Sequence, residues 1–522
     1  MKNNNIKLLL VLAATCFPSL SSAEIHSTQS ISGVYYHVDG DKSRSFYPGN
    51  EADYLYEGTF DFSKISLKEW EAFGNIEYRA TDDKLVDRQE FSIERMYMGL
   101  RAPGKEILVG DFYQNFSEYS LGNALKGLKV SIGDEKTSRL IMVGGLDMSR
   151  WEELWETRQD DSSTRRYVWG ARLENSLFNE KLALNFNYGG ARDDPAYMAT
   201  TTNPIMVNVF SIDAKYKINQ ILNTYGEIAQ SYTDTNLNDG AAPTKSDRAY
   251  KLGLDLNLKD YSLSSVYSRI GNYFNTTGGF SAQDLETINF DGLWFLPFKT
   301  KLTHYLHMDR DNLSKTKTTT TKQLNPGGKL SFSLPFSLNW DVGFDLRKRF
   351  SVDKTINQKT YTYSTNLSRD FRILFASLGY TKGIIVDRVS ADQERNTDTY
   401  TLALDGSFGI KQTKLSWNIS ENIIHDEYKQ VAKADFISST NVGLKLVFPS
   451  TLTFEGKVIL GNNDYYVNAS DSDTTDYYFA VSRDLAKDLA FIVSYQHKGY
   501  SYTGGDTNYA ENFIRTSLTY KF

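Results

Sequence analysis

Cysteine is nearly absent from this sequence of 522 residues, and the single one, Cys16, lies near the N-terminus. If a leader containing it is removed, the remaining chain has no disulfide and no thiolate metal site. It also has no covalently attached haem of the c type, because that attachment needs a CxxCH motif. Any electron transfer through such a chain would require a second, haem-carrying protein.

The first 23 residues have the pattern of such a leader. A basic start is followed by an apolar stretch over residues 6–14 and by small residues directly before Glu24. We therefore expect a signal peptide over residues 1–23 and a mature chain from Glu24. A lipoprotein signal is the alternative use of Cys16, but residues 13–15 before it lack the pattern of a lipobox.

Long apolar runs are also missing. Beyond the leader no run of 18 apolar residues occurs, so we expect no membrane-spanning helix, and the mean hydropathy is −0.45. The 34 tyrosines and 30 phenylalanines nevertheless form a heavy aromatic load, which is typical of barrels with aromatic girdles and a polar interior. Removing the two leader lysines leaves 56 basic against 64 acidic residues, a formal charge of −8, which argues against nucleic acid as a partner.

What the sequence does contain is strict alternation of apolar and polar residues. It extends from Phe336 to Arg347 and from Tyr250 to Lys259, and shorter runs of the same kind recur along the chain. The polar side of these runs carries charges that a two-sheet sandwich could not bury, whereas a water-filled lumen tolerates them. The residues we expect to line that lumen are Asp255, Asn257, Asp341, Asp345 and Arg347.

The connections between the runs alternate in length. Short ones, such as 259–260 and 449–450, separate strands at one end, and longer polar ones, such as 309–327 and 421–435, separate them at the other. Short periplasmic turns and long outer loops are the asymmetry expected of outer-membrane barrels.

Following this alternation predicts about 26 strands, within a range of 22 to 28. About nineteen follow Arg165; the first seven are expected near 29–38, 54–63, 69–80, 89–101, 105–113, 125–132 and 139–147. The prediction is an all-β fold, a single large antiparallel up-and-down transmembrane barrel over residues 24–522. The alternative is that residues 29–160 form a separate β-domain, which would leave a barrel of about 18 to 20 strands.

The final segment, ENFIRTSLTYKF, ends on an aromatic residue and places apolar residues at alternate positions before it. In this it resembles bacterial outer-membrane β-barrels, in which such a terminal strand is the signal that the assembly machinery reads. The resemblance implies that Leu518, Tyr520 and Phe522 form this signal. It also implies an outer-membrane location, with membrane lipid, lipopolysaccharide and the barrel assembly machinery as partners.

Two functions fit such a barrel. The first is a porin-like channel whose polar lumen passes small solutes or ions by diffusion. The second follows from a resemblance in size and lack of a plug to the barrel component of porin-cytochrome conduits, which implies a sheath around a periplasmic multihaem cytochrome for electron transfer across the outer membrane. The Cys pair near the start of some such barrels is missing here.

No motif points to catalysis, so we expect neither an enzyme nor a catalytic, cofactor-binding or metal site. Only His304 and His307 are close in the sequence, and a spacing of three in a strand sends them to opposite faces, where they cannot share a metal ion. A GxSxG-type nucleophile motif is absent.

Two segments depart from the alternation. The stretch 110–127 is flanked by glycines and is either an inward-folded constriction or an irregular hairpin with a wide loop. The stretch 151–155 with Arg158 places Trp151, Leu154 and Trp155 at helical spacing, either as a short helix folded into the mouth or as a loop cap.

Overall fold

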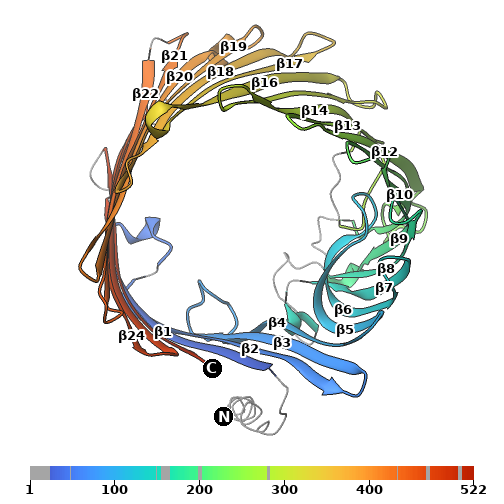
Figure 1. The fold of residues 1–522 in the computed structure, drawn as a ribbon, viewed down its shortest axis with the longest axis horizontal. Coiled ribbons are helices and arrows are strands. Elements are labelled where there is room, and N and C mark those ends of the chain that lie inside the picture. The colour runs from blue at the N-terminus through green and yellow to red at the C-terminus, as the bar shows by residue number, and fades with distance from the viewer. Residues whose placement is uncertain are drawn as a thin grey trace.

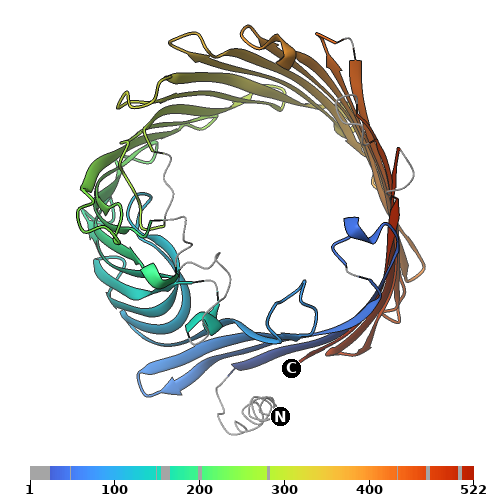
Figure 2. The ribbon, with the colours of Figure 1, turned by 180° about the vertical axis from the view of Figure 1, so that it is seen from behind.

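The computed structural model describes residues 24–47, 49–148, 150–154, 165–197, 203–278, 283–431, 433–465, 471–503 and 508–522. They form one antiparallel sheet of 26 strands that closes into a ring (Figures 1 and 2). The predicted fold class and strand number are confirmed. The leader expected over residues 1–23 lies outside the described residues and stays a prediction.

Consecutive strands are neighbours throughout the ring. The first thirteen are β1 (Glu24–Gly40), β2 (Glu51–Leu67), β3 (Trp70–Thr81), β4 (Phe91–Ala102), β5 (Lys105–Asn115), β6 (Gly122–Gly133), β7 (Ser138–Asp147), β8 (Arg166–Leu177), β9 (Leu182–Asp193), β10 (Met206–Lys217), β11 (Leu222–Asp234), β12 (Thr244–Asn257) and β13 (Tyr261–Ile270). The other thirteen are β14 (Leu285–Leu296), β15 (Thr300–Asp311), β16 (Thr321–Leu334), β17 (Leu338–Ser351), β18 (Asn357–Asp370), β19 (Leu374–Asp387), β20 (Arg395–Ile410), β21 (Thr413–Tyr428), β22 (Lys433–Val447), β23 (Thr453–Asp464), β24 (Ser472–Ala486), β25 (Leu489–Tyr502) and β26 (Tyr509–Lys521).

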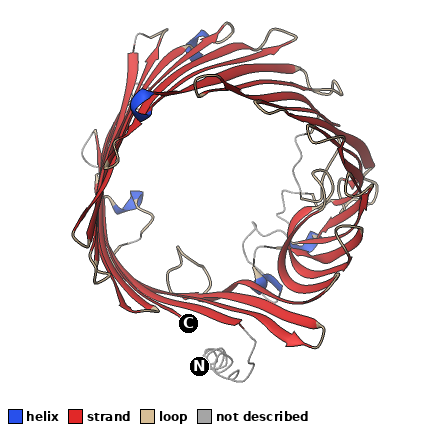
Figure 3. Ribbon diagram, in the orientation of Figure 1, coloured by secondary structure: helices blue, strands red, loops and turns tan. Residues whose placement is uncertain are grey.

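Helical structure in the described residues is limited to single turns of 3-10 helix in the connections (Figure 3). They are η1 (Lys42–Arg44), η2 (Trp151–Leu154), η3 (Pro195–Tyr197), η4 (Pro335–Ser337) and η5 (Ala391–Gln393). In the part of the chain that the structure describes, no helix is long and apolar enough to cross a membrane.

The two ends of the chain close the ring. β1 and β26 pair antiparallel from Thr28 opposite Lys521 to Gly40 opposite Tyr509. Beyond the strand end, the Ser27 amide donates to the Phe522 carbonyl at 2.7 Å, and the Phe522 amide donates back to the Ser27 carbonyl at 2.9 Å. Neither terminal strand therefore presents an unpaired edge.

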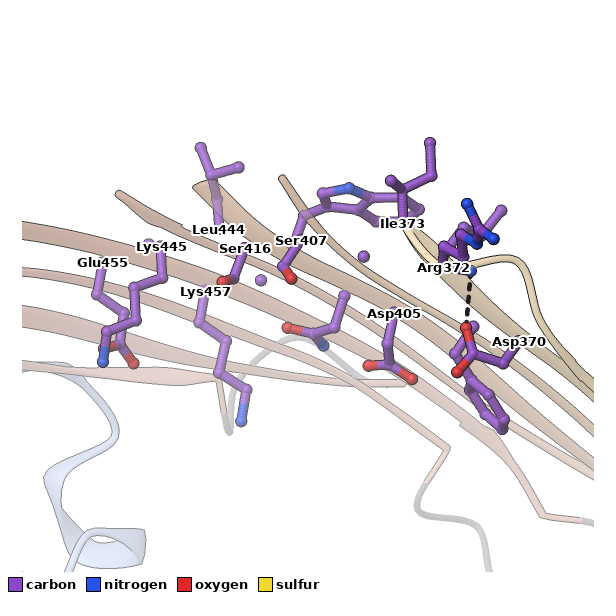
Figure 4. Close-up of a pocket in the computed structure, with 17 residues that line it drawn as sticks. Asp370, Arg372, Ile373, Asp405, Ser407, Ser416, Leu444, Lys445, Glu455 and Lys457 are labelled. Carbon is purple, nitrogen blue, oxygen red and sulfur yellow. Dashed lines mark hydrogen bonds and ion pairs between the residues drawn. The ribbon is translucent and has the colours of Figure 1, made fainter. Parts of the chain in front are cut away.

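The period-two pattern sorts side chains onto two faces, because successive residues of a strand point to opposite sides. Figure 4 shows Ile373 and Leu444 on one side of the wall and Lys445, Glu455 and Lys457 on the other, the side on which the segment carrying η1 lies. That segment lies inside the ring (Figure 1), so the charged face is the lumen face. The apolar face points outward.

The structure corrects the predicted outer loop 421–435. β21 continues to Tyr428 and β22 begins at Lys433, so only 429–432 connect them. Residues 421–428 are rich in polar groups, which suggested a loop, yet His425 and Asp426 remain paired with Phe436 and Asp435 of β22. A strand that projects beyond an apolar band keeps its backbone ladder while its side chains become polar, and composition alone cannot distinguish it from a loop.

One part of the ring is bent. Gly110 of β5 pairs with Gly127 of β6, which in turn pairs with Gly145 of β7, so three glycines form a row across the strands. A Cβ at Gly127 would lie 2.1 Å from the carbonyl oxygen of Gly144, and one at Gly110 would lie 2.2 Å from that of Met96. Only glycine allows these backbones to approach so closely, and β5 to β7 curve toward the lumen there (Figures 1 and 2).

Candidate functional site

The lumen face carries charged side chains in opposite-sign pairs. Lys329 of β16 lies 2.9 Å from Asp341 of β17, and Lys445 of β22 lies 3.4 Å from Glu455 of β23. Neither pair is buried, with exposed side-chain fractions of 51% and 30% for Lys329 and Asp341. Charges arranged in this way require water, so the lumen face suits polar solutes or a polar protein surface.

The five residues expected to line the lumen all lie on this face. Asp255 accepts a hydrogen bond of 2.8 Å from Ser264, and Arg347 donates to Gln323 at 2.9 Å. Asp341 is paired with Lys329 as described, and Asn257 is at the short-turn end of β12.

Asp345 accepts a hydrogen bond from the Tyr305 hydroxyl of β15. The structure places these residues in two groups, on β12 and on β17, and does not bring them into one cluster. Their effect on ion passage stays a prediction.

Free lumen charges occur on β20 to β23. Asp405 and Lys457 are exposed and line a shallow groove that also includes Lys445, Glu455 and Asn418 (Figure 4). Asp405 and Lys457 are not among the five residues expected to line the lumen, although each lies at a polar position of an alternating run. These charges contact water directly and are suited to influence passing ions.

A loop between β5 and β6, residues 116–121, folds onto the lumen side of the wall. Tyr119 is 2% exposed and packs against Phe274 and the inner side chains of β10 to β12, and Leu121 is 0% exposed in a second apolar cluster with Phe116. Glu227 of β11 accepts hydrogen bonds from Ser117 Oγ at 2.6 Å and from the Tyr119 amide at 3.3 Å. We call this loop the inner tip.

Arg172 of β8 anchors the base of the inner tip. Its guanidinium donates to Glu174 at 2.8 Å, to Asn187 at 2.8 Å, to Asp213 at 3.0 Å and to the Phe116 carbonyl. Four acceptors on three strands and the tip hold this cation in one place. The inner tip is therefore a fixed part of the lumen wall.

Each of the two alternatives for 110–127 is correct in part. The stretch does fold inward, as the constriction hypothesis required, but its tip lies flat against β8 to β12. The sequence signal that could have located the bend is the recurrence of glycine at 110, 127 and 145, since these three align in neighbouring strands.

The wall is incomplete where β5 bends away from β4. β4 and β5 pair only from Tyr97 opposite Gly110 to Ala102 opposite Lys105, so the other half of β4 has no partner on that side among the described strands. Two carboxylates replace the missing ladder there. The Ile93 amide donates to Glu152 of η2 at 2.7 Å, and the Met96 amide donates to Asp111 of β5 at 2.7 Å.

The η2 turn thus fills a seam in the wall. Its Trp151 indole donates to Asp111 at 2.5 Å and lies 5.2 Å from the Lys126 ammonium. Lys126 is itself 2.6 Å from Asp111, and its side chain is 7% exposed. For this stretch a short helix in the mouth and a loop cap were the alternatives; the structure has a 3-10 turn over Trp151–Leu154 at the wall, whereas Trp155 and Arg158 lie outside the described residues.

Next to η2, Arg150 forms an ion pair with Asp87 of the β3–β4 loop. Burial raises the pKa of the Asp87 carboxyl, but hydrogen bonds from Ser92 and Arg150 outweigh burial and hold that pKa below its ordinary value. The ion pair in turn raises the pKa of Arg150. The contact joins the loops at both sides of the seam.

His304 and His307 lie on opposite faces, as the strand spacing predicted. His304 stacks on Tyr261 of the outward face, with ring centroids 6.0 Å apart, and His307 lies 2.8 Å from Asp291 on the lumen face. Among the described residues, no group of three or more His, Cys, Asp or Glu side chains is arranged to hold a metal ion.

At the chain end, Ile514, Thr516, Leu518 and Tyr520 share the outward face of β26, and Phe522 follows directly after the strand. Tyr520 and Phe522 lie with ring centroids 5.6 Å apart and are each about half exposed, at 47% and 49%. Recognition of Leu518, Tyr520 and Phe522 by an assembly machinery stays a prediction.

No protein-family model and no curated protein matches the chain. Among solved structures it is similar to a mutant of the ferric enterobactin receptor PfeA from Pseudomonas aeruginosa, at 10% identity and a TM-score of 0.43, over 96% of this chain and 80% of that one. It is also similar to OccK3 from Pseudomonas aeruginosa, at 9% identity and a TM-score of 0.26, over 96% of both chains. A BenF-like porin from Pseudomonas fluorescens Pf-5 is similar at 10% identity and a TM-score of 0.28, over 96% of this chain and 99% of that one.

At these identities the comparisons assign no function, and the identification depends on the fold itself. A closed antiparallel ring leaves no strand edge unpaired, and its outward face is apolar while its lumen face is charged. That is the arrangement by which strands cross a bilayer. The chain is a bacterial outer-membrane β-barrel.

Proposed function

We propose that this barrel is a porin-like channel that passes small polar solutes or ions by diffusion. The observation that carries the proposal is the charged lumen face, on which pairs such as Lys329 and Asp341 and free groups such as Asp405 and Lys457 need water. About 26 strands at a spacing of ~4.8 Å and a tilt of ~40° imply a backbone diameter of roughly 50 Å.

The test is conductance in planar lipid bilayers. Purified barrel should open ohmic channels, and deleting residues 115–123 should raise the conductance of each channel, because it removes the inner tip from the lumen. Heat-modifiable migration in gels checks that the deleted barrel is folded. A folded barrel that conducts no ions would contradict the proposal, and unchanged conductance would show that the inner tip does not limit flow.

Ion selectivity gives a second readout. Asp341→Asn, Asp345→Asn and Asp405→Asn in one variant remove three negative charges from the lumen face. The cation-to-anion permeability ratio should fall by about twofold, measured as the reversal potential in a salt gradient. Glu427→Gln is the matched control, because Glu427 lies on the outward face of β21 and its loss should leave the ratio unchanged.

The estimated width favours a second candidate, a sheath around a multihaem cytochrome. In Figures 1 and 2 the described inward segments stay close to the wall of the ring, the η1 segment beside the last strands and the inner tip against β8 to β12, so a wide lumen would need a further occupant to remain selective. Extraction in mild detergent discriminates the two. A sheath should copurify with a haem-staining protein near one to one and conduct poorly, whereas a porin should purify alone and conduct.

A further inference from the structure

Four cations gather on the outward face of β15 to β18, at the ends that lead to the long loops. Arg310 of β15 pairs directly with Lys322 of β16, and Lys348 of β17 pairs directly with Lys359 of β18. The two pairs are adjacent, because Lys348 is also opposite Leu324, two residues from Lys322. We call these four residues the outer basic patch.

The outward direction of the patch follows from the register. Met308 pairs with Leu324, and Leu346 pairs with Tyr361, each two residues from a patch cation and therefore on the same face. Charged lumen residues such as Asp341 lie on the opposite face of these strands. The patch thus borders the apolar surface that contacts lipid.

The height of the patch matches the outer interface of a bilayer. Lys348 follows Leu338, the first outward residue of β17, by ten positions, and Lys359 precedes Arg369 of β18 by ten. A tilted strand needs about 9 to 11 residues to cross the hydrocarbon layer. Because Phe522 lies at the opposite, short-turn end, the patch is at the level of the outer headgroups.

The four cations are not tied to acidic partners by ion pairs in the described chain. None of them forms an ion pair there; Lys348 lies 4.8 Å from the Phe350 ring. Glu286 pairs in register with Arg310, but its carboxylate accepts a hydrogen bond of 3.0 Å from Tyr267 instead. Like charges placed directly opposite each other in neighbouring strands destabilise a sheet, and here two such pairs lie side by side.

We propose that the outer basic patch binds the phosphate groups of outer-leaflet lipid, with lipopolysaccharide as the occupant. Phosphate oxygens accept hydrogen bonds from several cations at once and remove the repulsion within both pairs. The acyl chains would then lie on Met308, Leu324, Leu346 and Tyr361 directly below. Because the four cations form two opposed pairs, a lipid with two phosphates would fit the patch better than a lipid with one.

The test measures lipid bound to the folded barrel in detergent by native mass spectrometry. The probes are lipid A with two phosphates, with one phosphate and with none. Wild-type barrel should retain bisphosphorylated lipid A most tightly and the dephosphorylated form least. The variant Lys322→Gln/Lys348→Gln/Lys359→Gln should weaken retention of the bisphosphorylated form by at least about tenfold, since each charged hydrogen bond contributes about 1.5 kcal/mol or more.

A matched variant, Lys301→Gln/Arg349→Gln, removes lumen-face cations of the same strands and should leave lipid retention unchanged. Heat-modifiable migration of both variants verifies folding. Equal retention by the patch variant, or equal binding of dephosphorylated lipid A, would overturn the proposal. So would displacement by millimolar inorganic phosphate, which would make the site one for free anions. Channel conductance is a separate measurement, so failure here leaves the proposed function standing.

Discussion

The indole nitrogen of Trp151 donates a hydrogen bond of 2.5 Å to the Asp111 carboxylate and so connects the β7–β8 segment to β5 at the seam beside β4. The same carboxylate accepts the Met96 amide of β4 at 2.7 Å. The Asp111 carboxylate therefore accepts a hydrogen bond from β4 where the backbone ladder between β4 and β5 is missing. At the seam the wall therefore depends on side chains.

Trp151→Phe should weaken the seam. The substitution keeps an aromatic ring but removes a hydrogen bond to a charged acceptor, so the free energy of unfolding should fall by about 2 kcal/mol. The midpoint of urea unfolding, followed by heat-modifiable migration, measures this. Trp169→Phe is the control, because the Trp169 indole donates at 3.0 Å to the neutral Tyr188 hydroxyl and its loss should cost less. An equal loss in both variants would contradict a special role for the seam.

Gly127→Ala should impair the bend. Its added Cβ would lie 2.1 Å from a backbone oxygen, so the strands would have to separate, at a cost of about 3 kcal/mol. The yield of protease-resistant barrel should fall. Gly144→Ala, seventeen residues further along in β7, should be tolerated because a Cβ there meets nothing within 4 Å. If both variants assemble like wild type, the glycine row does not determine the curvature.

Docking of the β3–β4 loop should depend on pH. The pKa of Asp87 is lower in the folded protein than in the unfolded chain. Its ion pair with Arg150 therefore stabilises the docked loop fully at pH values above the ordinary Asp pKa of about 3.9. This contribution is lost as the pH falls through the lower, folded value. Hydrogen exchange at the Gln89 amide, which donates to Asp87 at 2.9 Å, should lose protection there. In Asp87→Asn the protection should be weak at every pH, and an acid-dependent loss in that variant would contradict the assignment.

Removing residues 520–522 should prevent assembly and leave a protease-sensitive chain. The deletion removes the terminal aromatics and both backbone hydrogen bonds between Ser27 and Phe522. Phe522→Ala separates the two effects, because it keeps the backbone and removes only the ring. If Phe522→Ala fails as completely as the deletion, the aromatic signal dominates; a deleted chain that still migrates as a folded barrel would require a new topology.

The sequence predicted the barrel well because period-two alternation is a local property. The strand number and the outward face of β26 follow from counting along the chain. The bend could not be predicted in this way, since Gly110, Gly127 and Gly145 act only when register aligns them. Likewise Arg172 and Glu227 become anchors for the inner tip through contacts between distant strands, which no single run of residues reveals.

The closing pair of strands also dictates an order of events. Ser30 of β1 contacts Thr519 of β26, a separation of 489 residues, so the ring cannot close before the last strand has been made and delivered. Until then both ends of a long sheet are open and able to pair with other chains. The unpaired edge of β1 must therefore be kept from pairing with other chains until the 25 further strands have been added to the sheet.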